Sequence, residues 1–177
     1  TSYPTRMNRK DIEIMAPAGS YESLMAAVQG GADSVYFGAG ELNMRAASSV
    51  NFSPDDLRKI AGICRDNGLK SYLTLNVVVF DNETEKMKVM VDTAMSAGIS
   101  AIIASDLSVI KYAFGKGMEV HLSTQCNITN TEALRFFAQW ADVAVLAREL
   151  NLGQVRKIYD NIIEQDIRGP VNKHLYL

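Results

Sequence analysis

Short apolar runs alternate with amphipathic stretches along the whole chain, and this alternation predicts strands and helices in turn. The predicted strands cover residues 12–15, 34–37, 69–79, 101–104, 119–122 and 143–147. The stretches between them carry apolar residues at helical spacing, as Leu24, Ala27 and Val28 do in the first. The runs are continuous rather than alternating, which is typical of parallel strands covered on both faces.

Capping residues indicate where the helices begin and end. Ser53-Pro54-Asp55-Asp56 is a strong start signal, because it joins a capping serine to a first-turn proline and two acids. Weaker starts are predicted at Ser20, Asn82, Ser108, Thr129 and Asn151. The stretch from Thr129 to Glu132 resembles a capping box, in which a Thr is followed three positions later by a Glu. Glycines such as Gly98 then end helices.

Six strand–helix repeats predict an α/β fold with right-handed crossovers between parallel strands. Two architectures fit: a TIM-barrel-like (β/α) repeat and an open doubly wound sheet. A full barrel takes about 250 residues, so we predict an incomplete barrel of about six β/α units. We expect residues 1–11 to be a loosely ordered leader and residues 12–177 to form one domain. Residues 173–177 have the composition to begin a seventh strand.

Composition narrows the class of protein. The chain has 177 residues, 47% of them hydrophobic, and a net charge of −2. A broad basic surface for nucleic acid is therefore disfavoured, although RNA bound at a local cleft is not. Two cysteines are too few for a disulfide framework or a metal site and suit a reducing compartment. The sequence shows neither a signal peptide nor an apolar stretch of membrane length. We therefore predict a cytoplasmic protein without a metal site.

Polar residues gather directly after the predicted strands. The carboxyl ends of parallel strands are where ligands bind in such folds. The predicted substrate-binding residues are Asn43, Arg45, Asn76, Asp106, Ser123, Gln125, Asn127 and Arg148. The two arginines suit an anionic ligand. The plainer alternative is that Asp106 and Asn127 cap helices, as Asn130 would, and that Arg148 pairs with Glu149.

Two residues can carry acid–base chemistry, and we predict His121 and Glu149 as catalytic. His121 shares one strand face with Glu119 and Ser123, and a structural core histidine is the alternative role. His121 and Cys126 suggest a dyad, but five residues of extended chain separate them by about 16 Å. They meet only if the chain folds back at Ser123-Thr124.

Four segments together resemble one known family. They are IMAPAGSYESLMAAVQGGADSVYFGAGELNMRA, SYLTLNVVVF, HLSTQCNITN and VLARELNL, which begin at residues 14, 71, 121 and 145. They are similar to the N-terminal region of peptidase family U32, the collagenase-like proteases, over about residues 12–163. The resemblance implies a TIM-barrel-like fold and a protease activity. It also implies that this chain is a fragment of a longer protein.

The same resemblance implies a second chemistry. Some members of the family hydroxylate tRNA or ribosomal RNA bases, or a quinone precursor, without oxygen. They use an iron–sulfur cluster held by four cysteines, and those that act on RNA depend on prephenate. Cys64 and Cys126 do not match those cysteines. We therefore expect no cofactor in this chain, and a cluster only in a longer parent protein.

Three interpretations of function follow. The first is a U32-type peptidase domain, whose activity as a fragment is left open. The second is the substrate-binding part of a prephenate-dependent RNA-base hydroxylase, and the third is a non-catalytic binding or assembly domain. The expected partners are accordingly a polypeptide or RNA substrate, with no membrane. We also expect a homo-oligomer, because an unclosed barrel leaves an open sheet edge.

Overall fold

One parallel sheet organises the protein. The computed structural model describes residue 9 and residues 12–43 and 52–177. Six strands lie side by side in chain order, and every neighbouring pair is parallel. They are β1 (Met15–Pro17), β2 (Ser34–Gly38), β3 (Lys70–Leu75), β4 (Ala101–Ala104), β5 (Glu119–Leu122) and β6 (Val143–Ala144). A helix separates each strand from the next, so the predicted α/β repeat is confirmed.

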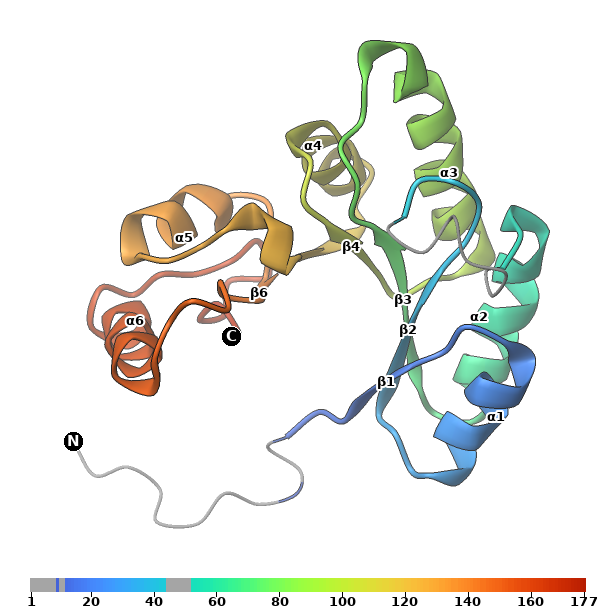
Figure 1. Cartoon of the computed structure of the whole chain (residues 1–177), viewed down its shortest axis with the longest axis horizontal. Coiled ribbons are helices and arrows are strands. Elements are labelled where there is room, and N and C mark those ends of the chain that lie inside the picture. Colours follow the sequence, from blue (N-terminus) through green and yellow to red (C-terminus); the bar gives the residue numbers. More distant parts are fainter. Residues whose placement is uncertain (1–8, 10–11, 44–51) are drawn as a thin grey trace.

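The helices surround the strands on the outside. They are α1 (Tyr21–Gln29), α2 (Leu57–Asp66), α3 (Thr84–Ala97), α4 (Leu107–Gly115), α5 (Thr131–Phe137) and α6 (Leu152–Glu164). Figure 1 shows them following one another in an arc around the sheet, from α1 and α2 on one side to α5 and α6 on the other. A curled parallel sheet inside such an arc is a half-barrel. The TIM-barrel-like prediction is therefore confirmed in preference to a doubly wound sheet, whose helices cover both faces.

The two faces of the sheet differ in chemistry. Successive side chains of a strand point to opposite faces, and those that belong to the core under the helices are apolar, such as Val35 and Phe37 in β2 and Leu73 and Leu75 in β3. The alternate positions form the inner face of the half-barrel. They include polar side chains, namely Ser34, Tyr36, Lys70, Tyr72, Thr74, Glu119 and His121.

The C-terminal residues cover the outer edge of β6. Tyr176 forms a parallel bridge with Val143, and its backbone exchanges hydrogen bonds with Ala144 (2.8 Å) and Asp142 (2.9 Å). Leu175 is only 4% exposed. The predicted seventh strand at residues 173–177 is thus present as a single bridge in the position that a seventh barrel strand takes. At the other edge, β1 has no second strand partner among the described residues.

The first, third and sixth strands differ from their predicted bounds, and β6 ends at Ala144 rather than residue 147. β1 begins at Met15 rather than residue 12, because the Ile14 N–H donates to the Asp33 carboxylate (2.7 Å) instead of to a strand. Pro17 lies inside β1, where an edge strand tolerates its missing N–H. β3 ends at Leu75 rather than residue 79, since the Val79 N–H donates to the Asp106 carboxylate (3.1 Å) and leaves the sheet.

Three helix starts also need correction. The cap of α5 is Asn130, whose side chain accepts from the Ala133 N–H (2.9 Å), so the predicted Thr129 capping box is wrong by one residue. α3 begins at Thr84 after a short 3-10 turn rather than at Asn82. α4 begins at Leu107 with Asp106 as its cap, rather than at Ser108. The predicted caps Ser20 and Asn151 are confirmed.

Candidate functional site

Most of the predicted site residues follow the carboxyl ends of the strands. Because the strands are parallel, the connections after β2 to β6 leave one end of the sheet, and seven predicted residues lie in them. They are Asn43, Asn76, Asp106, Ser123, Gln125, Asn127 and Arg148. Glu149 follows Arg148, and Arg45 lies outside the described residues. We call this end of the sheet the rim.

Asn43 fixes the connection after β2. It is 3% exposed, and its Nδ2 donates to the carbonyl oxygens of Gly40 (3.1 Å) and Ala39 (3.4 Å). Its side chain lies against Gly38, where an added Cβ would come within 2.4 Å of Asn43 Oδ1. Only glycine at the end of β2 leaves room for this amide. Asn43 is therefore placed to hold the rim together.

Asp106 connects three parts of the rim. Its Oδ1 accepts from the Ser108 N–H (2.8 Å) and caps α4, while its Oδ2 accepts from the Val79 N–H (3.1 Å) in the connection after β3. Partial burial favours the neutral acid, but these hydrogen bonds outweigh it and lower the pKa of Asp106. The predicted capping role is confirmed. The same carboxylate also anchors the chain that follows Asn76, which is half-buried.

A short 3-10 turn, η4 (Thr124–Cys126), folds the chain over the ends of β4 and β5. The Ser123 hydroxyl is buried and donates to the Gln125 side-chain oxygen, whereas Gln125 itself is exposed. Asn127 adopts a left-handed conformation (φ 52°) and is the C-terminal cap of this 3-10 turn, with its N–H donating to the Thr124 carbonyl, rather than the N-terminal cap of an α-helix. Asparagine tolerates this conformation better than most residues.

Cys126 and His121 do not form a dyad. The Cys126 thiol lies 3.7 Å from the Ala104 carbonyl oxygen and 3.8 Å from that of Ser105, and burial raises its pKa to about 11. His121 instead bonds to Glu119 on its own strand. The turn at Ser123-Thr124 is present, but it directs the thiol to backbone carbonyls.

Arg148 and Glu149 end the rim. Both are exposed, and they form no ion pair with each other or with another described residue. The alternative that they simply pair is therefore wrong. The Ala147 N–H donates to the Ile128 carbonyl (3.0 Å), which joins this connection to the one after β5. Arg148 and Asn127 thus lie in connections that contact each other.

His121 lies on the inner face, close to the rim. Its Nε2 is 2.8 Å from Glu119 Oε1, and this hydrogen bond lowers the pKa of Glu119 against the opposing effect of burial. The His121 ring packs edge-on against Tyr72, with ring centroids 4.6 Å apart. The structure therefore joins His121 to Glu119 rather than to Glu149, and the two predicted catalytic residues are not in contact.

Four inner-face residues continue this arrangement toward the amino end of the strands, and we call them the Glu13 cluster: Glu13, Ser34, Lys70 and Tyr72. The Tyr72 hydroxyl donates to Glu13 Oε1 (2.6 Å), and Lys70 Nζ lies 3.4 Å from Oε2. Burial and the Glu13 carboxylate raise the pKa of Tyr72. Burial opposes the charge on Glu13, but Tyr72, Ser34 and Lys70 together lower its pKa.

Ser34 is the least satisfied member of the cluster. Its side chain is fully buried and influences Glu13 and Tyr72, yet its Oγ reaches neither at hydrogen-bond geometry. Sequence analysis missed the Glu13 cluster. The one available signal was the recurrence of polar residues at inward positions of neighbouring strands, with Ser34 in β2 and Lys70 and Tyr72 in β3.

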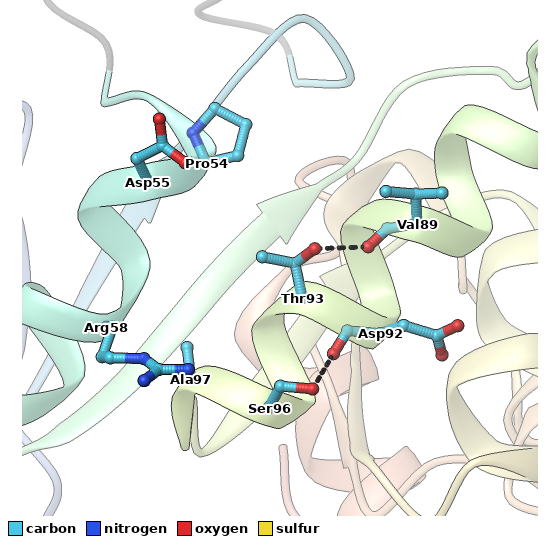
Figure 2. A pocket seen from close by; sticks show the side chains of 8 residues that line it. All are labelled: Pro54, Asp55, Arg58, Val89, Asp92, Thr93, Ser96 and Ala97. Carbon is cyan, nitrogen blue, oxygen red and sulfur yellow. Dashed lines mark hydrogen bonds between the residues drawn. The ribbon is translucent and has the colours of Figure 1, made fainter.

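A surface groove lies between α2 and α3. It has a volume of about 410 Å³, and Figure 2 shows Asp55 and Arg58 on one wall and Val89, Asp92 and Thr93 on the other. The hydroxyls of Thr93 and Ser96 donate to carbonyls of their own helix. The groove contains none of the predicted site residues and no inner-face residue, and we assign it no chemistry.

The described residues offer no metal-binding arrangement. Among them, no group of three or more His, Cys, Asp or Glu side chains is placed to hold a metal ion. The two cysteines do not fit a four-thiolate iron–sulfur cluster, since Cys64 is buried in the core on α2 and Cys126 faces backbone carbonyls. Within the same residues, no helix is both long and apolar enough to span a membrane.

Comparison with known proteins gives a consistent picture. The model of peptidase family U32 matches residues 19–169. A collagenase of Porphyromonas gingivalis is 60% identical over 164 residues, which are 93% of this chain and 40% of that protein. The tRNA hydroxylation protein P1 of Bacillus subtilis is 30% identical over 170 residues, also 93% and 40%. This chain thus spans about two fifths of the length of both relatives.

A solved structure agrees in fold. The U32 peptidase Mk0906 superposes with a TM-score of 0.70 at 14% sequence identity, covering 89% of this chain and 68% of that one. At this identity the likeness supports the fold alone. It agrees with the half-barrel built from strand order and helix placement.

Proposed function

Since this chain belongs to peptidase family U32, we propose that it is the part of a U32 peptidase that binds a polypeptide at the rim and the inner face. The observation that carries the proposal is the 60% identity to the collagenase of Porphyromonas gingivalis over nearly the whole chain. The inner face supports it, because His121 there has the partners of a general base.

In this proposal His121 acts on water. If Nε2 carries the proton donated to Glu119, Nδ1 keeps a lone pair. Nδ1 has no hydrogen-bond partner among the described residues. Among the same residues, Ser34 Oγ is the one fully buried side-chain polar atom that lacks a partner. Nδ1 is therefore not fully buried and can contact water. Nδ1 takes a proton from water as the water oxygen attacks the scissile carbonyl. The same proton then goes to the leaving amine nitrogen.

Glu119 is the positioning residue of this pair. Its carboxylate holds the imidazole in one tautomer and stabilises the imidazolium that forms, as a third group does in a catalytic triad. The rim residues Asn43 and Asp106 hold the connections around the site. Arg148, exposed and without an ion pair in the described part, is available for a carboxylate of the substrate.

The test uses an unfolded polypeptide. Fluorescein-labelled casein is incubated with this chain and with His121→Gln, and cleavage is followed by gel and fluorescence. His174→Gln is the matched control, because His174 is the only other histidine. We expect cleavage or binding by the unaltered chain and by His174→Gln, with cleavage lost in His121→Gln. Equal cleavage by His121→Gln refutes its role as base.

A second function rests on a separate observation, the 30% identity to the tRNA hydroxylation protein P1 of Bacillus subtilis. It would make this chain the substrate-binding part of an RNA-base hydroxylase. The cysteines present here do not fit its cluster, so we derive no chemical step for it. Binding of an unmodified tRNA transcript, with no binding or cleavage of casein, favours this function over the first.

A further inference from the structure

The connection from β3 to α3 exposes apolar side chains beside the rim. Residues 77–80 form what we call the rim segment. Val77 and Val79 pack against the core, while Val78 and Phe80 are 68% and 66% exposed. This alternation has the period of an extended chain rather than that of a helix. Figure 1 shows the connection running away from the end of β3 before it turns back into α3.

Hydrogen bonds hold the rim segment in place. The Val79 N–H donates to Asp106 Oδ2 (3.1 Å), and the Phe80 N–H donates to Glu83 Oε2 (3.0 Å). The Glu83 N–H returns a bond to the Phe80 carbonyl (2.8 Å). Phe80 itself is extended, with φ −83° and ψ 159°. The two apolar side chains are therefore presented to solvent by an anchored backbone.

The backbone of Val78 forms no hydrogen bond with another described residue. In an extended chain, the backbone groups of adjacent residues point to opposite sides. The Val79 N–H is already bound to Asp106, so within this pair Val78 is the residue whose backbone groups stay available. Strand addition depends on main-chain hydrogen bonds together with alternate side chains. Val78 offers a donor and an acceptor that no described residue occupies, and the side chains of Val78 and Phe80 are exposed on either side of Val79.

We propose that the rim segment binds an extended polypeptide as an added strand, through the backbone N–H and carbonyl of Val78 and the side chains of Val78 and Phe80. The inference rests on the proposed peptidase function and names how its substrate is held. Nearby charge favours a polypeptide over RNA. Asp106 and Glu83 accept hydrogen bonds from the segment and Asp81 follows it directly in sequence, so their negative charges repel phosphates.

The experiment compares two probes. One is a capped, fluorescein-labelled peptide, Lys-Val-Ser-Val-Lys-Phe-Ser, and the other is the same peptide with an N-methyl group on its central valine. The methyl group removes one strand hydrogen bond and blocks pairing. Fluorescence polarisation should give at least tenfold weaker binding for the methylated probe.

Variants locate the binding. Val78→Pro removes the N–H and should weaken the unmethylated probe about tenfold, which corresponds to about 1.4 kcal/mol. Phe80→Ala should weaken it several-fold. Leu152→Ala is the matched control, because Leu152 is 88% exposed on α6 and lies outside the proposed surface. Circular dichroism checks folding, and the probe comparison on the unaltered chain stands even if Val78→Pro does not fold.

Two outcomes overturn the inference. Equal binding of both probes, or unchanged binding by a folded Val78→Pro, means that polypeptide is held elsewhere, while the peptidase proposal remains. Failure of the unaltered chain to bind the peptide refutes strand addition, and casein cleavage then decides the peptidase proposal separately. Loss of peptide binding in Phe80→Ala together with discrimination between the probes supports the inference.

Discussion

Gly38 is the most sensitive backbone position that the structure identifies near the rim. A Cβ at this position would lie 2.4 Å from Asn43 Oδ1, 2.6 Å from Cγ and 2.9 Å from Nδ2, so in Gly38→Ala the amide must move. The displaced Asn43 loses its bonds to Ala39 and Gly40, at about 1 kcal/mol each. Residual crowding adds about 1 kcal/mol.

We therefore expect Gly38→Ala to lower the free energy of unfolding by about 3 kcal/mol. With a urea m-value of about 2 kcal/mol/M, the unfolding midpoint should fall by about 1.5 M. Equilibrium urea unfolding, followed by circular dichroism, measures the change. The structure attributes this loss to Asn43, which gives the experiment an internal control.

The control is a double-mutant cycle with Asn43→Ala. This variant alone should cost about 2 kcal/mol, because its buried bonds are lost. In that background the obstacle to a Cβ is gone, and Gly38→Ala should then cost less than about 1 kcal/mol. An equal loss in both backgrounds would show that the strand end needs glycine for another reason, and the argument from the close approach of Asn43 would fail.

Three further predictions follow. Asp106→Ala should cost about 2 kcal/mol at pH 7, through the α4 cap and the Val79 anchor. The folded state lowers the pKa of Asp106, so its contribution to the free energy of unfolding is complete above the unfolded pKa of about 4 and is lost as the pH falls through the folded pKa. The urea midpoints of variant and parent should therefore converge in acid. Deleting residues 171–177 removes buried Leu175 and two backbone hydrogen bonds to the β6 edge, and should lower the free energy of unfolding by about 3 kcal/mol. Light scattering should then show increased association through the uncovered edge. A variant that stays monomeric would mean that the edge is protected in another way. Burial raises the pKa of Cys64 and Cys126 to about 11, so neither thiol should react rapidly with a disulfide reagent at pH 8 in the folded protein, whereas both should react in urea.

Local patterns were sufficient for the order of elements. The alternation of apolar runs and amphipathic stretches gave all six strands and the helices between them, because each element depends mainly on its own residues. Caps at Ser20 and Asn151 were predicted for the same reason. The predicted bounds of a strand were wrong where a side chain distant in sequence accepts a hydrogen bond from a backbone N–H. Asp106 ends β3 early by binding Val79, and no local signal records that contact.

The inner face was harder to predict from sequence. Tyr72 and Glu13 are 59 residues apart, and they meet only because β1 and β3 curl toward each other across β2. Glu119 was recognised as sharing a face with His121, but its hydrogen bond to that ring depends on side-chain geometry. The catalytic and substrate-binding roles of the predicted residues, and the expected homo-oligomer, stay predictions that the experiments above address.

The strand order has a consequence for how the chain folds. Because the order in space is the order in sequence, each β/α unit pairs with the unit made just before it. Folding can therefore proceed by adding units from the amino end during synthesis, without waiting for a distant segment to close the sheet. Until residues 173–177 appear, however, the newest strand is always an unpaired edge. Residues 173–177 then cover the edge of β6 through the bridge between Tyr176 and Val143, as β2 to β6 each cover the edge of the strand before them.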